Sequence, residues 1–174
     1  MPATTLLPLV QSIEEVLADG HGTARVLAAA DRFRMSFFEG EPKGHSAIEA
    51  RVNKTAFVYV SDMRARKDSQ EMSTVAHYDV TVTILAAYYL GHEGVSGENR
   101  AALAAASLDY HKVRAALCYP GNLRLTMVGA VETGLAGGML IAPGSRWGAV
   151  LDHENRLLRA TFTFPGIVIL TMPS

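Results

Sequence analysis

The chain has 174 residues, of which 49% are hydrophobic and 19% charged, and its formal net charge at pH 7 is -1. This length suits one well-cored domain, so we expect a single domain over residues 1–174. A nearly neutral chain offers no basic field to hold a nucleic-acid backbone, and its single cysteine excludes an internal disulfide. The start, MPATTLLPLVQSIEE, has no signal-peptide pattern, and no apolar run approaches the ~20 residues that span a bilayer. These features predict a soluble protein made and kept inside a cell, without a membrane partner.

The first part of the chain predicts a helix and then a short strand followed by a charged loop. Residues 5–18 repeat apolar side chains at helical spacing, and Asp19-Gly20 follows as a stop signal. TAFVYV, residues 55–60, is typical of a short, largely apolar strand. The charged residues 61–73 then form a loop that is longer than a hairpin requires, and long ordered loops tend to carry function.

Residues 76–90, AHYDVTVTILAAYYL, predict a long strand in a sheet with one wet side, because apolar and polar side chains alternate along it. Val80, Val82 and Ile84 share the apolar face. The clearest helix follows, with Ser96 as its candidate N-cap and Pro120-Gly121 as its stop. We expect its apolar stripe to contain Leu103, Tyr110, Val113 and Leu117.

The last part of the chain is glycine-rich and then strongly strand-like. NLRLTMV, residues 122–128, and RWGAVLD, residues 146–152, are candidate strands around the loop GLAGGML. From residue 159 the sequence alternates with period two, which places Phe162 and Phe164 on one face. We expect Pro165-Gly166 to interrupt this strand before Ile167, Val168, Ile169 and Leu170 continue it.

The order of elements predicts an α+β fold, with a mostly antiparallel mixed sheet and helices packed on one face. Almost no chain follows the final strand, so we expect its apolar edge to be covered either by the rest of the sheet or by a neighbouring copy. The candidate sheet-core or subunit-interface residues are Val80, Val82, Ile84, Phe162, Phe164, Ile167 and Ile169.

The sequence carries no recognisable catalytic or cofactor motif. The glycines of GLAGG lack the spacing of a dinucleotide loop, and no phosphate loop ending in Lys and Ser or Thr occurs. None of the six histidines has metal-ligand spacing, and no Gly-x-Ser-x-Gly elbow is present. We therefore expect no enzyme activity, no cofactor and no metal site.

One compact basic cluster stands out in the charged loop: Arg64, Arg66 and Lys67. Asp62, Asp68 and Glu71 nearly neutralise it, which favours an ordinary solvated loop. The alternative is that the loop docks onto a protein partner.

The order of these pieces resembles the tail-terminator, or tail-completion, proteins of long-tailed bacteriophages. The resemblance covers most of the chain: the helix LLPLVQSIEEVLA, the turn FFEGEP, the strand TAFVYVSD, the strand HYDVTVTILAAYYL, the helix LDYHKVRAALCYP and a final strand. It lies in the sequence of elements and in no signature residue. The chain departs from the family in extra material around residues 121–153, and no catalytic residue can be carried over.

The resemblance implies a small α+β subunit that forms a ring, hexameric in that family, which caps the tail tube and joins it to the head. Its partners would be further copies of itself, the tail tube protein and the head–tail connector or stopper, with DNA only passing through the lumen. Its place would be the tail or neck of the virion, after assembly in the host cytoplasm.

Two other interpretations remain open from the sequence. The chain could be a different neck or tail ring protein, such as a head-completion stopper or a baseplate component. It could instead be a small-molecule enzyme or binding domain that gathers Tyr88, Tyr89, His92 and Trp147 around a pocket.

Overall fold

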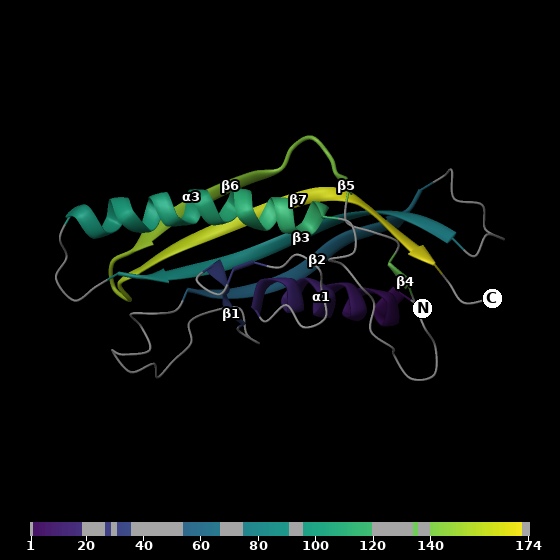
Figure 1. Cartoon of the computed structure of the whole chain (residues 1–174), viewed down its shortest axis with the longest axis horizontal. Helices are drawn as coiled ribbons and strands as arrows, with labels where there is room; N and C mark the ends of the chain where they lie inside the picture. Colours follow the sequence, from purple (N-terminus) through teal and green to yellow (C-terminus); the bar gives the residue numbers. More distant parts are fainter. Residues whose placement is uncertain are drawn as a thin grey trace.

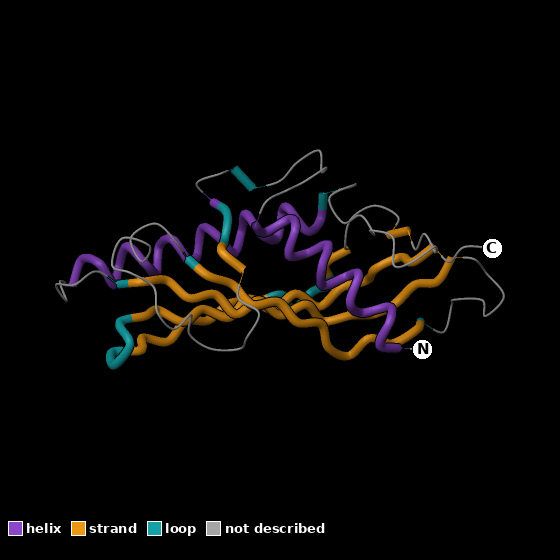
Figure 2. The backbone as a smooth tube through the Cα atoms, turned by 90° about the horizontal axis from the view of Figure 1, so that it is seen from below, coloured by secondary structure: helices purple, strands orange, loops and turns teal. Residues whose placement is uncertain are grey.

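A computed structural model describes residues 2–18, 27–28, 31–35, 54–66, 75–90, 96–119, 134–135 and 140–171. In this part of the chain, two helices contact one open, mixed and mostly antiparallel sheet, which confirms the expected α+β fold. Figure 2 shows both helices on the same side of the sheet. The candidate strand at residues 122–128 and the basic residue Lys67 lie outside the described residues.

The sheet is built around three long strands, β2 (Thr55–Ala65), β3 (Val75–Tyr89) and β7 (Leu157–Thr171). β2 pairs antiparallel with β3, and β3 pairs antiparallel with β7 over the full length of both strands. The short β1 (Arg34–Met35) adds to β2 in parallel at one side (Figure 1). At the other side three strands follow one another along β7: β6 (Arg146–Asp152), β5 (Leu140–Ile141) and β4 (Gly134–Leu135).

The final strand is therefore an interior strand of the sheet. β3 pairs with it on one side and β6, β5 and β4 on the other, so the chain's own sheet covers it and no neighbouring copy is needed for that purpose.

The expected interruption at Pro165-Gly166 is wrong, because β7 continues through both residues. β6 pairs with β7 only as far as Thr163, and β5 begins at Gly166, so Pro165 falls in the gap between them. The Pro165 carbonyl faces this gap and accepts a hydrogen bond of 2.8 Å from the Ala142 N–H. A missing N–H costs little at a point where no ladder partner lies opposite.

β2 is longer than expected and takes the first residues of the predicted loop. It ends at Ala65, and a shift in its register with β3 lies between Ser61 and Arg64. Asp62 has a φ of 55° at this bulge, a conformation that Asp tolerates better than most residues. The charged segment therefore begins as part of the sheet.

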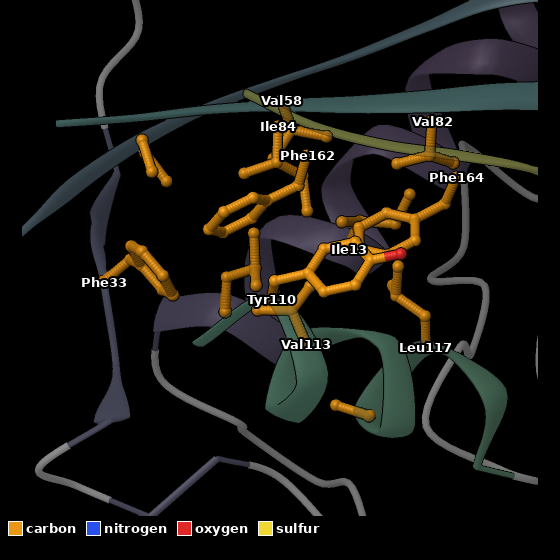
Figure 3. Close-up of a cluster of buried hydrophobic side chains, with 14 of the residues drawn as sticks. Ile13, Phe33, Val58, Val82, Ile84, Tyr110, Val113, Leu117, Phe162 and Phe164 are labelled. Carbon is orange, nitrogen blue, oxygen red and sulfur yellow. The ribbon is translucent and has the colours of Figure 1, made fainter. Parts of the chain in front are cut away.

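The core lies between the helices and the apolar face of the three long strands. Val80, Val82 and Ile84 of β3 are at most 2% exposed, and Phe162 and Phe164 of β7 are fully buried. Val82 pairs with Phe164 and Ile84 with Phe162, so these side chains stand side by side beneath the helices (Figure 3). The period-two patterns of both strands predicted this face correctly.

The helix α1 (Pro2–Ala18) packs over β1 and β2 and buries Leu9, Ile13, Val16 and Leu17. These four positions follow the three- and four-residue spacing of one helix face. Ser12 is buried among them, and its hydroxyl has no hydrogen-bond partner in the described part of the chain.

The helix α3 (Ser96–Cys118) packs mainly over β7 and β6. It buries Tyr110, Val113 and Leu117 as expected, and the Tyr110 ring stacks on Phe164 with 5.3 Å between centroids. Leu103 is 38% exposed, so its assignment to the core was wrong. Figure 2 shows the start of α3 projecting past the ends of the strands.

Candidate interaction surfaces and a buried ionic cluster

Of the three basic residues of the predicted docking loop, the structure describes Arg64 and Arg66, whereas Lys67 lies outside the described residues. Arg64 is exposed near the end of β2, where it pairs with Asp79 of β3. Arg66 makes an ion pair with Asp79 of the neighbouring strand, with 3.2 Å between Nη1 and Oδ1. The two side chains of this pair are 35% and 56% exposed, so the pair contributes little to stability.

The sheet face turned away from the helices is mixed in character. It carries the alternate residues of each strand, including the exposed Tyr59 on β2 and the exposed Arg159 and Thr161 on β7. Ile167 lies on this face and is half-buried, so it stands opposite to Phe162 and Phe164, on the other side of the sheet. The side chain of Ile169 is outside the described part.

Among the described residues, β6 is the outer strand of the sheet on the side opposite β1 (Figure 1). Its seven residues pair with β7 in an unbroken antiparallel register from Arg146 to Asp152. Val150 is 70% exposed, the highest exposure among the large apolar side chains that the structure describes. β6 contains no proline or bulge, and its charged residues, Arg146 and Asp152, stand only at its two ends, so its middle lacks the usual devices that prevent strand-to-strand association at an edge.

The turn that follows β6 is held by the carboxylate of Asp152. This carboxylate accepts a hydrogen bond of 3.2 Å from the Asn155 N–H and lies 2.8 Å from the Arg159 guanidinium. The Asn155 side chain, the Arg159 guanidinium and the Asn155 backbone hold the pKa of Asp152 below its usual value. Arg156 closes the turn with a φ of 53°. The hairpin tip is therefore a defined turn with exposed charges.

The closest approach to a catalytic constellation is a buried ionic cluster at the end of the sheet where β2 begins. The Lys54 ammonium lies 2.8 Å from both oxygens of Asp109, and the Tyr88 hydroxyl donates a 2.8 Å hydrogen bond to the same carboxylate. The side chain of Asp109 is 5% exposed and that of Lys54 is 14% exposed. Burial, together with the negative charge of Asp109, raises the pKa of the Tyr88 hydroxyl far above its ordinary value.

Aromatic rings close the same cluster. The Lys54 ammonium lies 4.5 Å from the centroid of the Phe33 ring, which meets the Tyr88 ring edge-on. Each charged group is thus matched within the cluster, and Tyr88 keeps its proton at physiological pH. This arrangement ties α3 to β2 and β3, and it is the kind of buried ion pair that holds elements in register.

A second, more exposed ion pair joins α3 to the segment before β1. The Lys112 ammonium lies 2.6 Å from Asp31, one turn along α3 from Asp109. These side chains are 36% and 22% exposed. The two pairs together attach the segment before β1 and the residue before β2 to the same helix.

The sequence could have indicated only half of this cluster. Asp109 falls on the buried stripe of α3, between Ala106 and Val113, and a carboxylate at such a position needs a partner. Its partner Lys54 lies 55 residues away along the chain, so no local pattern identifies it.

The structure does not gather the residues of the possible small-molecule pocket. Tyr88 and Tyr89 are neighbours on β3 and therefore point to opposite faces of the sheet. Trp147 is half-buried on β6, and β7 separates that strand from β3. His92 lies outside the described residues.

In the part of the chain that the structure describes, no group of three or more His, Cys, Asp or Glu residues is arranged to hold a metal ion. None of the described helices is long and apolar enough to cross a membrane. No family model matches the chain, and no curated protein matches it significantly.

Proposed function

We propose that the chain is a structural protein of the neck or tail of a long-tailed bacteriophage, where it forms a ring that ends the tail tube and joins it to the head connector. The observation that carries this proposal is the order of the elements in the folded chain. An N-terminal helix, two long hairpin strands, a long helix and a long final strand form one open sheet with both helices on one side. This is the arrangement that the resemblance implies.

The chemistry of the described residues supports a role in assembly. The ionisable side chains of Lys54, Asp109 and Tyr88 satisfy one another in a buried cluster. Within the described residues, the edge strand β6 and the sheet face turned away from the helices are exposed, and both are surfaces suited to binding proteins. The function of such a subunit is steric: it offers one surface to the tube and another to the connector.

The final strand offers no edge for contact with a neighbouring copy, because β7 is inside the sheet. A ring must therefore close through other surfaces, by a head-to-tail contact repeated around the rotation axis. Arg64, exposed at the end of β2, is the described residue of the predicted docking loop that remains available to contact the tube or the connector.

The first experiment is negative-stain microscopy of the purified protein over a range of concentrations, with its mass measured by light scattering. Rings of about six copies with a central hole support the proposal. The protein is then mixed with purified tail tubes of the phage that encodes it, where we expect it to bind only at tube ends. Absence of rings together with absence of binding to tube ends would contradict the proposal, and binding to a purified connector or baseplate alone would favour the other ring proteins.

Arg64→Glu tests the docking residue with a matched control. We expect this variant to fold and to form rings normally but to bind tube ends more weakly, because it reverses an exposed charge away from the core. Arg114→Glu makes the same charge change at an exposed position on α3 and should bind as the wild type does. Equal binding by both variants would show that Arg64 is only a solvated residue.

A further inference from the structure

The edge strand β6 has a sequence that is complementary to itself when it is read in the opposite direction. Pairing two copies antiparallel about Ala149 places Arg146 opposite Asp152, Trp147 opposite Leu151 and Gly148 opposite Val150 of the other copy. We infer that this chain forms a two-fold pair in which the β6 strands of two copies join their sheets into one.

The charges at the two ends of β6 favour this register. Arg146 is exposed and carries no acid opposite it within the sheet, since its partner on β7 is Thr163. Asp152 lies on the same face, six residues further along. The two-fold brings each Arg146 beside the Asp152 of the other copy, which makes two equivalent charge pairs. A carboxylate has room for more than the bonds from Asn155 and Arg159 that it already accepts.

The side-chain sizes favour the same register. Val150 is 70% exposed, and a Cβ placed on Gly148 would meet no atom within 4 Å. Across the two-fold axis, the exposed Val150 side chain of one copy lies over the open space beside Gly148 of the other copy. Both residues are on the face away from the helices, because their partners on β7 are Arg159 and Thr161.

On the helix face the register pairs apolar residues. Trp147, Ala149 and Leu151 are half-buried and pack against the core of their own copy. In the pair, the exposed parts of Trp147 and Leu151 cover one another across the two-fold, and the two Ala149 side chains meet at its centre.

The backbone allows this pairing whichever of its groups face outward. In an antiparallel ladder, alternate residues direct their N–H and C=O groups to opposite edges. A two-fold axis at residue 149 pairs odd-numbered residues with odd-numbered ones and even with even. The residues whose N–H and C=O groups point outward in one copy therefore lie opposite the outward-pointing residues of the other copy. An edge of seven residues without a bulge can then form an unbroken ladder.

This inference goes beyond the proposed function and does not depend on it. A two-fold contact uses the same surface on both copies and closes after two subunits, so it is not the head-to-tail contact of a ring. If both contacts operate, the β6 pair joins subunits of two rings.

Cysteine cross-linking tests the register directly, in a Cys118→Ala background. Gly148→Cys and Val150→Cys proteins are prepared separately and then mixed under mild oxidation. The two-fold places residue 148 of one copy directly opposite residue 150 of the other, at a Cβ separation of ~4.5–5.5 Å that a disulfide can bridge with a small adjustment. Within either single variant the two cysteines are diagonal across the strands, beyond the ~7 Å Cα limit for a disulfide.

We expect a covalent pair in the mixed sample and little in either variant alone, on a non-reducing gel and by mass spectrometry. Equal cross-linking in all three samples would indicate random collision, and no cross-linking in the mixture would exclude the register. Either result overturns the inference, whatever rings the wild type forms.

A charge reversal provides the second readout. Arg146→Glu sets an acid beside Asp152 at both ends of the pair, and we expect this to weaken pairing by about tenfold in light scattering or sedimentation. Arg114→Glu is the matched control and should pair as the wild type does. Equal pairing by the two variants would argue against the Arg146–Asp152 contact and hence against the inference.

Discussion

Replacing Lys54 by Met tests the buried ionic cluster most directly. The change removes the ammonium but keeps a side chain of similar length against the Phe33 ring. It leaves the Asp109 carboxylate, which is 5% exposed, with only the hydrogen bond from Tyr88. Breaking a buried ion pair by removing one partner typically costs 3–5 kcal/mol. Because the retained hydroxyl and the 14% exposure of Lys54 soften this loss, we expect about 2–4 kcal/mol.

The measurement is the free energy of unfolding from urea titration at neutral pH, with Lys112→Met as the control. Lys112 makes its ion pair on the same helix, but the two side chains of that pair are 36% and 22% exposed, so its loss should cost about 0–1 kcal/mol. Adding Asp109→Asn to Lys54→Met should recover most of the loss, because the neutral amide still accepts from Tyr88. If Lys54→Met costs no more than Lys112→Met, the cluster does not stabilise the fold as described.

Three further changes test the core, the aromatic stack and the hairpin. Phe162→Asp buries an unpaired charge at a fully buried position and should prevent folding, whereas Phe162→Leu should fold with a loss of about 1–2 kcal/mol; soluble expression and urea titration report both. Tyr110→Phe keeps the stack on Phe164 but removes the 2.9 Å hydrogen bond to Ser145, and it should cost about 1 kcal/mol by the same titration. The pKa of Asp152 is lower in the folded protein than its ordinary value of 3.8, so the ionised carboxylate stabilises the fold at pH values above 3.8. This stabilisation is lost as the pH falls through the pKa of the folded state. Asp152→Asn should therefore reduce the fall in the free energy of unfolding at acid pH. An unchanged pH dependence would count against the contacts of Asp152 in the hairpin.

The helix and strand patterns in the sequence determined the main elements of this protein. Alternation along β3 identified the face that carries Val82 and Ile84, and the same period in β7 identified Phe162 and Phe164. The candidate N-cap Ser96 and the stop signal Pro120-Gly121 indicated the extent of α3, which spans Ser96–Cys118. These features are local, because burial on one face of a strand or helix requires a fixed spacing along the chain.

The place of each element in the sheet was decided only by the tertiary structure. β7 looks like an exposed edge at the end of the sequence, yet β3 and β6 enclose it, since the order of strands in a sheet does not follow the order in the chain. The continuation of β7 through Pro165 likewise depends on a gap between two neighbouring strands.

The candidate interaction features depend on tertiary structure in the same way. Leu103 fits the apolar spacing of α3 but is 38% exposed, so spacing along a helix does not by itself decide burial. Asp109 finds Lys54 only when residues 55 positions apart are brought together. The sequence by itself determined which residues can be buried and where the elements run; the fold alone decided which strand forms the edge, because an edge is defined by the neighbours that a strand lacks.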